Sequence, residues 1–157
     1  MISEEHKNLL FKASIFSGLS PEQLTSVLDT VREVSYGEGE IIMNEGDEGG
    51  ELFVIVEGSI QIEKKAGDNF TIKIARTEQR GMLIGEMSLI DMKPRSATVR
   101  ADSPVTLLGL KREDLAVLFD EDPKVLATIS LNIARLLSDR LRHSNDMFAE
   151  LFSHFTA

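Results

Sequence analysis

The residues with the clearest chemical potential lie in one short segment. Gly85-Glu86-Met87-Ser88-Leu89 is followed, after a short gap, by Pro94-Arg95-Ser96-Ala97-Thr98-Val99. Arginine presents a fork of donors that matches the oxygens of a phosphate, and a carboxylate accepts a hydrogen bond from a hydroxyl. Small residues allow backbone N–H groups to approach an anion closely. The segment therefore suits a ligand that carries both a phosphate and a sugar hydroxyl.

The start of this segment is also suited to a short helix. A helix that begins at Glu86 would add free N–H groups at Met87 and Ser88 to the anion site. A second interpretation is purely structural, because apolar residues follow Arg95 and the arginine could be partly buried and paired with Glu86. Desolvation offsets the attraction within a buried ion pair, so such a pair contributes little stability by itself. We therefore favour ligand binding as the role of Glu86 and Arg95.

The joined pattern resembles the phosphate-binding cassette of the cyclic nucleotide-binding domain family. That family includes bacterial catabolite activator proteins and the regulatory subunits of cAMP-dependent protein kinase, and its pattern is approximately Gly-Glu-x-x-Leu followed by Pro-Arg-small-Ala-Thr-Val. The resemblance implies that Glu86 binds the ribose 2′-hydroxyl and that Arg95 binds the cyclic phosphate. It also implies that Gly85 and the N–H groups of Ser96 and Ala97 complete the phosphate site.

The residue after the cassette arginine bears on the choice of nucleotide. Kinase-type relatives that prefer cGMP typically have threonine at this position, whereas catabolite activators have serine, as this chain does at Ser96. The resemblance thus implies cAMP as the first choice, with cGMP and cyclic dinucleotides as alternatives. Aligned through Asp122-Pro123 and Ala134-Arg135, the chain has Arg140 and Leu141 where catabolite activators place hydroxyl residues against adenine. Arg140 is a candidate to stack on the base, with a surface arginine as the alternative.

The composition restricts the classes of function. The 157 residues, of which 42% are hydrophobic, suit one globular domain. The absence of cysteine excludes disulfides, iron–sulfur clusters and cysteine nucleophiles. The net charge of −9 argues against a nucleic-acid surface. The N-terminus lacks the features of a secretory signal, and no apolar run has membrane-spanning length, so we expect a cytoplasmic protein without membrane contact.

No pattern typical of an enzyme is recognisable. The sequence has no cluster with metal-ligand spacing, no nucleophile with a matching base and no Walker motif. We therefore expect a binding module that is not an enzyme and that carries no metal.

Helical segments are expected before a β-rich centre. Residues 3–17 carry apolar side chains at near-helical spacing, and Ser20-Pro21-Glu22-Gln23 has the N-cap, first-position proline and capping box of a second helix, whose apolar face extends to Val31. From about Val34 to Leu110, short β-prone runs alternate with glycines, which is typical of an all-β sandwich or barrel. The predicted strands are Ile41–Met43, Leu52–Val56, Ser59–Glu63, Phe70–Ala75, Ala97–Arg100 and Thr106–Leu110.

Family resemblance makes this centre an eight-stranded antiparallel jelly roll, the β-roll, in a mainly β domain with flanking helices. The expected organisation of the single domain is a helical entry over residues 1–33 and a β-roll over 34–111, with the cassette at 84–99. A short and a long helix follow over 112–145, and an apolar tail occupies 146–157.

Two loops invite specific interpretations. The acidic segment from Glu45 to Glu51 could suggest a calcium loop, but it lacks the EF-hand ligand spacing, so a solvated turn is expected. Residues 65–69 are expected to form a hairpin loop between two strands with one wet face.

The long C-terminal helix carries a broad apolar stripe. Glu113 to Phe119 predicts a short helix, and Asp122-Pro123 opens the long one with a correctly placed cap and proline. One edge of the stripe repeats at spacings of three and four, as two-stranded helical dimers require. In catabolite activators the matching helix forms the dimer interface, so we predict a homodimer through residues 123–145, with packing on the chain's own β-domain as the alternative. The predicted dimer seam consists of Leu126, Ile129, Ile133 and Leu136.

The last residues form a further apolar stripe at helical spacing, which is expected to be buried. It could pack on the β-domain, extend the dimer, dock a partner, or act as a lid over the nucleotide base. The stripe consists of Met147, Phe148, Leu151, Phe152 and Phe155. Residues 145–157 are too few for a helix-turn-helix module, which needs about 35 helical residues, so no DNA binding is expected.

The sequence thus predicts a regulatory module that binds a cyclic nucleotide, with cAMP as first choice, and moves its C-terminal helices to signal to an unknown effector protein. The alternative is the same fold without nucleotide binding, serving as a dimerisation or protein-interaction scaffold.

Overall fold

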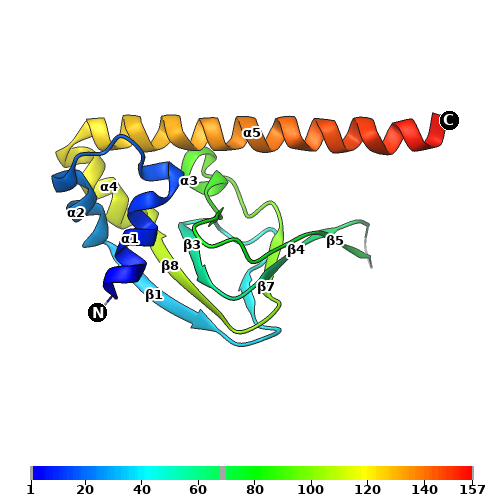
Figure 1. The fold of residues 1–157 in the computed structure, drawn as a ribbon, viewed down its shortest axis with the longest axis horizontal. Helices are drawn as coiled ribbons and strands as arrows, with labels where there is room; N and C mark the ends of the chain where they lie inside the picture. The colour runs from blue at the N-terminus through cyan, green and yellow to red at the C-terminus, as the bar shows by residue number, and fades with distance from the viewer. Residues whose placement is uncertain (1, 68–69, 157) are drawn as a thin grey trace.

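Two four-stranded antiparallel sheets form the centre of the molecule in the computed structural model, which describes residues 2–67 and 70–156 (Figure 1). The first sheet has the order β1-β8-β3-β6 and the second has the order β2-β7-β4-β5, with all pairs antiparallel. The predicted eight-stranded β-roll is confirmed. The strands are β1 (Val31–Tyr36), β2 (Ile41–Met43), β3 (Glu51–Glu57), β4 (Ile60–Lys65), β5 (Thr71–Thr77), β6 (Leu83–Ile84), β7 (Thr98–Ala101) and β8 (Val105–Lys111).

Helices cover the outer face of the first sheet and flank the β-roll in the chain. They are α1 (Glu4–Lys12), the 3₁₀ turn η1 (Ser14–Phe16), α2 (Pro21–Leu28), α3 (Met87–Asp91), α4 (Arg112–Glu121) and α5 (Pro123–Thr156). The predicted capping box of α2 is confirmed, because the N–H of Gln23 donates to Ser20 Oγ and the N–H of Ser20 donates to the Gln23 side chain.

The buried apolar side chains form two clusters, one on each face of the first sheet. One cluster lies between the two sheets and includes Phe53 and Val99. The other lies between the first sheet and the helices, and it joins Val54 to Phe16 and Ile129. The first sheet is therefore buried on both faces, which explains the continuous apolar run of β3.

Two strands were absent from the sequence prediction, β1 and β6. Helix α2 ends at Leu28 and β1 begins at Val31, so the helical entry is shorter than predicted and Val31 belongs to the sheet. The apolar spacing of α2 extends to Val31 by coincidence, because β1 pairs with β8 along its whole length. Strand β6 has only two residues, too few for any periodicity to be read.

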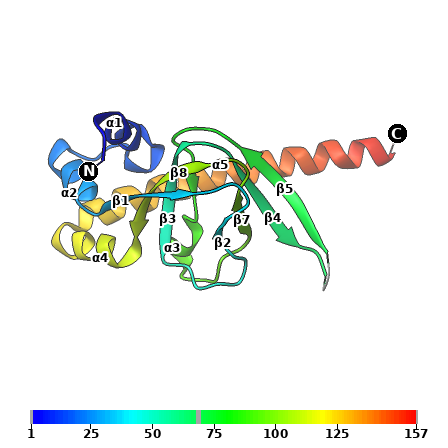
Figure 2. The ribbon, with the colours of Figure 1, turned by 90° about the horizontal axis from the view of Figure 1, so that it is seen from below.

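The hairpin of β4 and β5 projects from the roll below α5 (Figures 1 and 2). The predicted loop at 65–69 connects these strands, and its residues 68–69 lie outside the described residues.

Helix α5 is the longest element, with 34 residues that run without interruption into the predicted tail. Its first half packs on η1 and α4, while its second half runs above the β4–β5 hairpin and ends beyond it (Figure 1). Four of the five tail side chains expected to be buried are instead exposed within one chain, with Phe148 at 59% and Leu151 at 56%, while the side chain of Phe155 lies outside the described part of the chain. The tail therefore does not pack on the β-domain. Nowhere in the described part of the chain is a helix long and apolar enough to cross a membrane.

The predicted dimer seam on α5 is wrong. Ile129 and Ile133 are fully buried against the chain's own helices and first sheet, and Leu136 packs on the same cluster. The Asn132 side chain joins them, donating to the backbone oxygens of Ile15 and Ser17 at 2.9 and 2.7 Å. Three of the four predicted seam residues thus face the chain's own domain, whereas the fourth, Leu126, is 41% exposed.

Candidate functional site

The cassette is the connection from β6 through α3 to β7, and its geometry depends first on Gly85. This residue has φ +77°, a conformation that favours glycine. A Cβ at Gly85 would lie 2.6 Å from Arg95 Nη1 and 2.9 Å from the backbone oxygen of Glu51. Glycine is thus required here both for backbone conformation and for the close approach of the arginine.

The Arg95 guanidinium is held by three neutral oxygens. Nη1 donates to the Gly85 oxygen at 3.1 Å and to Ser88 Oγ at 3.0 Å, and Nη2 donates to the Glu51 backbone oxygen at 2.6 Å. Burial lowers the pKa of Arg95, partly offset by nearby carboxylates including that of Glu86. Within the described residues, Arg95 forms no ion pair. The structural alternative, an Arg95–Glu86 pair, is therefore wrong.

The acidic loop before β3 holds the backbone of Arg95 through hydrogen bonds. The Arg95 N–H donates to the Asp47 oxygen at 2.8 Å, and the Gly46 N–H donates to the Arg95 oxygen at 2.9 Å. A Cβ at Gly49 would lie 2.2 Å from Ser88 Cβ, so the loop packs directly on α3. Among the described residues no group of acidic or histidine side chains could hold a metal ion. The predicted solvated turn is confirmed at Gly46, Asp47 and Glu48, which are exposed, and the loop also supports the cassette.

The carboxylate of the cassette pattern belongs to Glu86, which is 2% exposed and pairs with Arg140 of α5. Arg140 Nη1 donates to Glu86 Oε1, and Nη2 donates to the backbone oxygen of Leu83 at 2.7 Å. A residue 54 positions away in the chain thus contacts the cassette carboxylate. The suggested stacking of Arg140 on a base stays a prediction, and here its guanidinium lies on Glu86.

The remaining predicted residues surround this centre. Ser88 is buried and donates to the Gly85 oxygen at 3.1 Å, whereas Met87 is 43% exposed at the start of α3. Ser96 is exposed, with Oγ 3.8 Å from Met87 Sδ, and Ala97 next to it is half-buried. The fold therefore brings the predicted cassette residues together with Arg140, while their roles in binding stay predictions.

Three contributors were missed by sequence reasoning. The Glu51 oxygen is a backbone atom and leaves no signal in the residue type, and Gly49 is one of many loop glycines. Lys64 donates to the Ser96 backbone oxygen at 2.6 Å while pairing with Glu45. A lysine in an alternating strand is usually solvent-facing, so only the pairing of β4 with β7 could reveal this contact.

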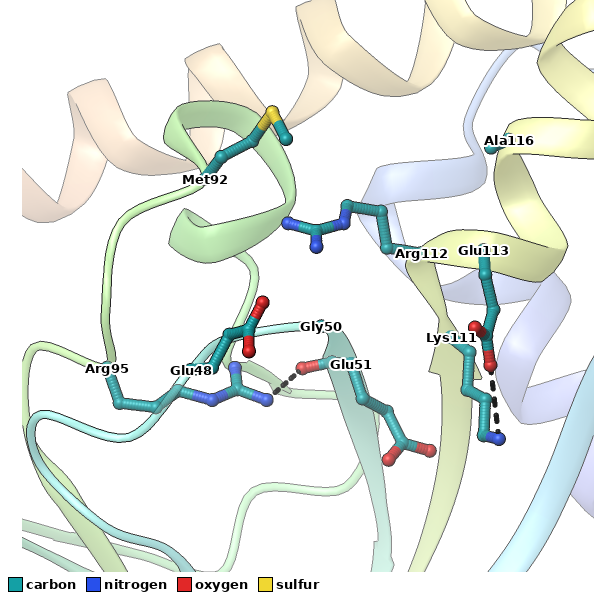
Figure 3. Close-up of a pocket in the computed structure, with 9 residues that line it drawn as sticks. All are labelled: Glu48, Gly50, Glu51, Met92, Arg95, Lys111, Arg112, Glu113 and Ala116. Carbon is teal, nitrogen blue, oxygen red and sulfur yellow. Dashed lines mark hydrogen bonds and ion pairs between the residues drawn. The ribbon is translucent and has the colours of Figure 1, made fainter.

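A pocket of about 570 Å³ lies beside the cassette, between it and α4 (Figure 3). Of the eight predicted binding residues it contains only Arg95. We call it the outer pocket. Its wall includes Glu48 and Gly50 before β3, Met92 and Arg95 in the cassette, and Lys111 and Arg112 where β8 meets α4.

Comparison with known proteins agrees with this geometry. Residues 33–122 match the family model described as the cyclic nucleotide-binding domain. The chain is 33% identical over 141 residues to the cyclic AMP receptor protein of Thermus thermophilus, covering 88% of this chain and 62% of that protein. It is 29% identical over 145 residues to mouse cGMP-dependent protein kinase 2, covering 90% of this chain and 19% of the kinase. The chain therefore spans a fifth to three-fifths of the curated relatives it matches.

The fold has close counterparts among solved structures. A cyclic nucleotide-binding domain from Methylobacillus flagellatus superposes with a TM-score of 0.79 at 29% identity, covering 92% of this chain and 80% of that one. The family model spans more than half of the chain, and the cassette lies within it. The chain belongs to the cyclic nucleotide-binding domain family.

Proposed function

We propose that this protein is a regulatory module that binds a cyclic nucleotide, with cAMP as the first-choice ligand. The observation that carries the proposal is Arg95, a half-buried cation held only by neutral oxygens and placed near a buried carboxylate. Burial of a charge is costly unless an opposite charge accompanies it. A cyclic phosphate supplies that charge, and a phosphate accepts the fork of donors that a guanidinium offers.

We expect Glu86 to bind the ribose. Its Oε1 accepts from Arg140. A carboxylate has two oxygens and about four acceptor sites, so we expect Glu86 to accept from a 2′-hydroxyl while Arg140 remains in place. Ser96 and Ala97, at the entry to β7, are expected to complete the phosphate contacts.

The same carboxylate offers a route from ligand to helix. Arg140 joins α5 to the cassette through Glu86 and the Leu83 oxygen. A ligand that binds Glu86 and Arg95 changes the position of α5 to the extent that it binds the two helix positions with different affinity. We propose that a partner protein responds to this change in the position of α5.

A second copy of the chain is the partner we propose for the outer face of α5. This face repeats at spacings of three and four, opposite the buried face, and all its residues are exposed. Asn145 occupies a position where a single polar residue favours a parallel two-stranded register. The proposed seam consists of Leu131, Ala134, Ser138, Leu141, Asn145 and Phe148.

The dimer has a direct test in sedimentation velocity. Leu141→Glu places a charge in the seam and is expected to yield monomers at concentrations where the unchanged chain forms dimers. Val117→Glu is the matched control, because Val117 is 58% exposed on α4 and lies outside the seam. Dimers that survive Leu141→Glu, or are lost equally in Val117→Glu, would contradict the proposed seam.

Calorimetric titration with cAMP and cGMP tests the central proposal. Saturable binding of either, lost in Arg95→Ala, is expected, with cAMP the tighter of the two. Absence of binding to both would favour the alternative, a scaffold that keeps the fold without the ligand. Incubation with cyclic nucleotide followed by a search for the linear monophosphate tests the expectation that the module is not an enzyme.

A further inference from the structure

The two peptide groups that precede β7 are each fixed by a donor on the carbonyl side. The Arg95 oxygen accepts from the Gly46 N–H at 2.9 Å. The Ser96 oxygen accepts from Lys64 Nζ at 2.6 Å. In a trans peptide group the C=O and N–H bonds point in opposite directions. Fixing these two oxygens therefore directs the N–H groups of Ser96 and Ala97, which belong to the same two peptide groups, to the opposite side.

Sheet pairing does not supply the contact to the Ser96 oxygen. The register of β4 with β7 ends at the pair of Glu63 with Thr98, so Ser96 lies two residues outside it. Lys64 is the next residue of β4, and it reaches this oxygen with its side chain. Because 44% of the Lys64 side chain is exposed, water could solvate the ammonium without this contact. The fold alone therefore does not explain why the ammonium lies on the cassette.

Glu45 holds the Lys64 ammonium in this position. Its Oε1 accepts from Lys64 Nζ at 2.6 Å, and its Oε2 accepts from the backbone N–H of Lys65 at 2.9 Å. The Glu45 N–H also donates to Thr98 Oγ1 at 3.0 Å, at the start of β7. The carboxylate is thus fixed to both β4 and β7, and it keeps the ammonium beside the Ser96 oxygen.

We propose that Lys64 is a positioning residue of the nucleotide site and acts through the peptide group that joins Ser96 to Ala97. A cation on the carbonyl oxygen polarises this group, so its N–H is a stronger donor as well as a directed one. The ligand group that the N–H would bind is the anionic phosphate of a cyclic nucleotide, so this role rests on the proposed function. The orientation of the peptide group does not, because it belongs to the chain without ligand.

Amide NMR of the ¹⁵N-labelled full chain tests the orientation without nucleotide. Lys64→Met removes the ammonium but keeps a side chain of similar length, and it should shift the Ala97 amide resonance. Lys65→Met is the matched control, because Lys65 is the neighbouring residue of β4, carries the same charge and has an exposed side chain. It should leave the Ala97 resonance in place. Equal shifts in the two variants, or no shift in either, would overturn the proposal.

Calorimetric titration with cAMP tests the role in binding. Lys64→Met should weaken the affinity about three- to tenfold, the effect of roughly one hydrogen bond, whereas Lys65→Met should leave it nearly unchanged. Lys64→Arg keeps a donor for the Ser96 oxygen and should recover part of the loss. Glu45→Gln should also weaken binding, and its combination with Lys64→Met should bind as Lys64→Met alone does, because both residues act through one ammonium.

The two diastereomers of cAMP that carry one sulfur on the phosphate identify the contact. Sulfur is a weak hydrogen-bond acceptor, so each diastereomer weakens the contacts of one exocyclic oxygen. If Lys64 acts through a single N–H, Lys64→Met should reduce the penalty for one diastereomer and leave the penalty for the other unchanged. Equal changes for both diastereomers, as a general loss of positive charge would produce, would contradict this route.

The NMR and binding results separate this inference from the proposed function. If the chain binds neither cAMP nor cGMP but the Ala97 resonance shifts only in Lys64→Met, the proposed function and the role in binding are refuted, while the orientation of the peptide group stands. If Lys64→Met binds cAMP as tightly as Lys65→Met, the proposed function stands and Lys64 is not a positioning residue.

Discussion

The contact between Arg140 and Glu86 makes the sharpest prediction about this molecule. Arg140→Gln removes the guanidinium that pairs with the buried carboxylate and donates to Leu83. Breaking a buried pair by removing one partner costs about 3–5 kcal/mol. Because the Arg140 side chain is 35% exposed, solvent screens part of this interaction. We therefore expect a loss of about 1–3 kcal/mol in the free energy of unfolding.

A double-mutant cycle isolates the pair. Glu86→Gln alone leaves Arg140 without its carboxylate, and the double variant removes both charges together. We expect the double variant to be more stable than the sum of the single losses predicts, with a coupling free energy of about 1–2 kcal/mol. Arg142→Gln is the control, since this exposed residue lies two positions away and should change stability by less than about 0.5 kcal/mol.

Urea unfolding at one fixed protein concentration measures these differences, because dimer formation would make stability depend on concentration. Thermal unfolding should show the same order, at about 2–4 °C for each kcal/mol. If Arg140→Gln is as stable as Arg142→Gln, or if the two single losses simply add, the coupling between α5 and the cassette is absent.

Two further predictions concern the cassette, and one concerns the contact of Gln23 in α2 with Asp122 between α4 and α5. Arg95→Ala should weaken cAMP binding by about 2–5 kcal/mol, and Arg95→Lys should recover only part of this loss because the fork of donors is lost. If calorimetry gives Arg95→Ala the same affinity for cAMP as the unchanged chain, the assigned role of Arg95 is refuted. In urea unfolding, Gly85→Ala should lower the free energy of unfolding more than Gly39→Ala. Both residues have positive φ, but a Cβ at Gly85 would meet Arg95, whereas nothing lies within 4 Å of a Cβ at Gly39. Equal losses of unfolding free energy in the two variants would refute the steric argument. A hydrogen bond from Gln23 lowers the pKa of Asp122, so its stabilising effect is present above about pH 4 and is lost as pH falls through the folded-state pKa. The stability deficit of Asp122→Asn in thermal unfolding should therefore be seen at pH 7 and shrink as the pH falls below about 4, and a deficit that does not shrink in acid would contradict this assignment.

Signals confined to short stretches of chain were sufficient to predict much of the fold. The capping box at Ser20 and Gln23 specifies a helix start because both partners lie within one turn. The β-prone runs predicted six of the eight strands, since their residue types and flanking glycines act locally. The cassette segment was recognisable for the same reason, because its glycine, acid and arginine lie within one short stretch of sequence.

The tertiary structure alone decided which groups these residues meet. The partner of Glu86 is Arg140, 54 residues away, and one acceptor for Arg95 is a backbone oxygen that any residue at position 51 would carry. The apolar residues of α5 were visible in sequence, but whether Ile129 faces its own domain or a second chain was not, because helical spacing is the same for both. Periodicity and residue type report local conformation and polarity, whereas the pairing of distant groups depends on how the sheets and helices pack together.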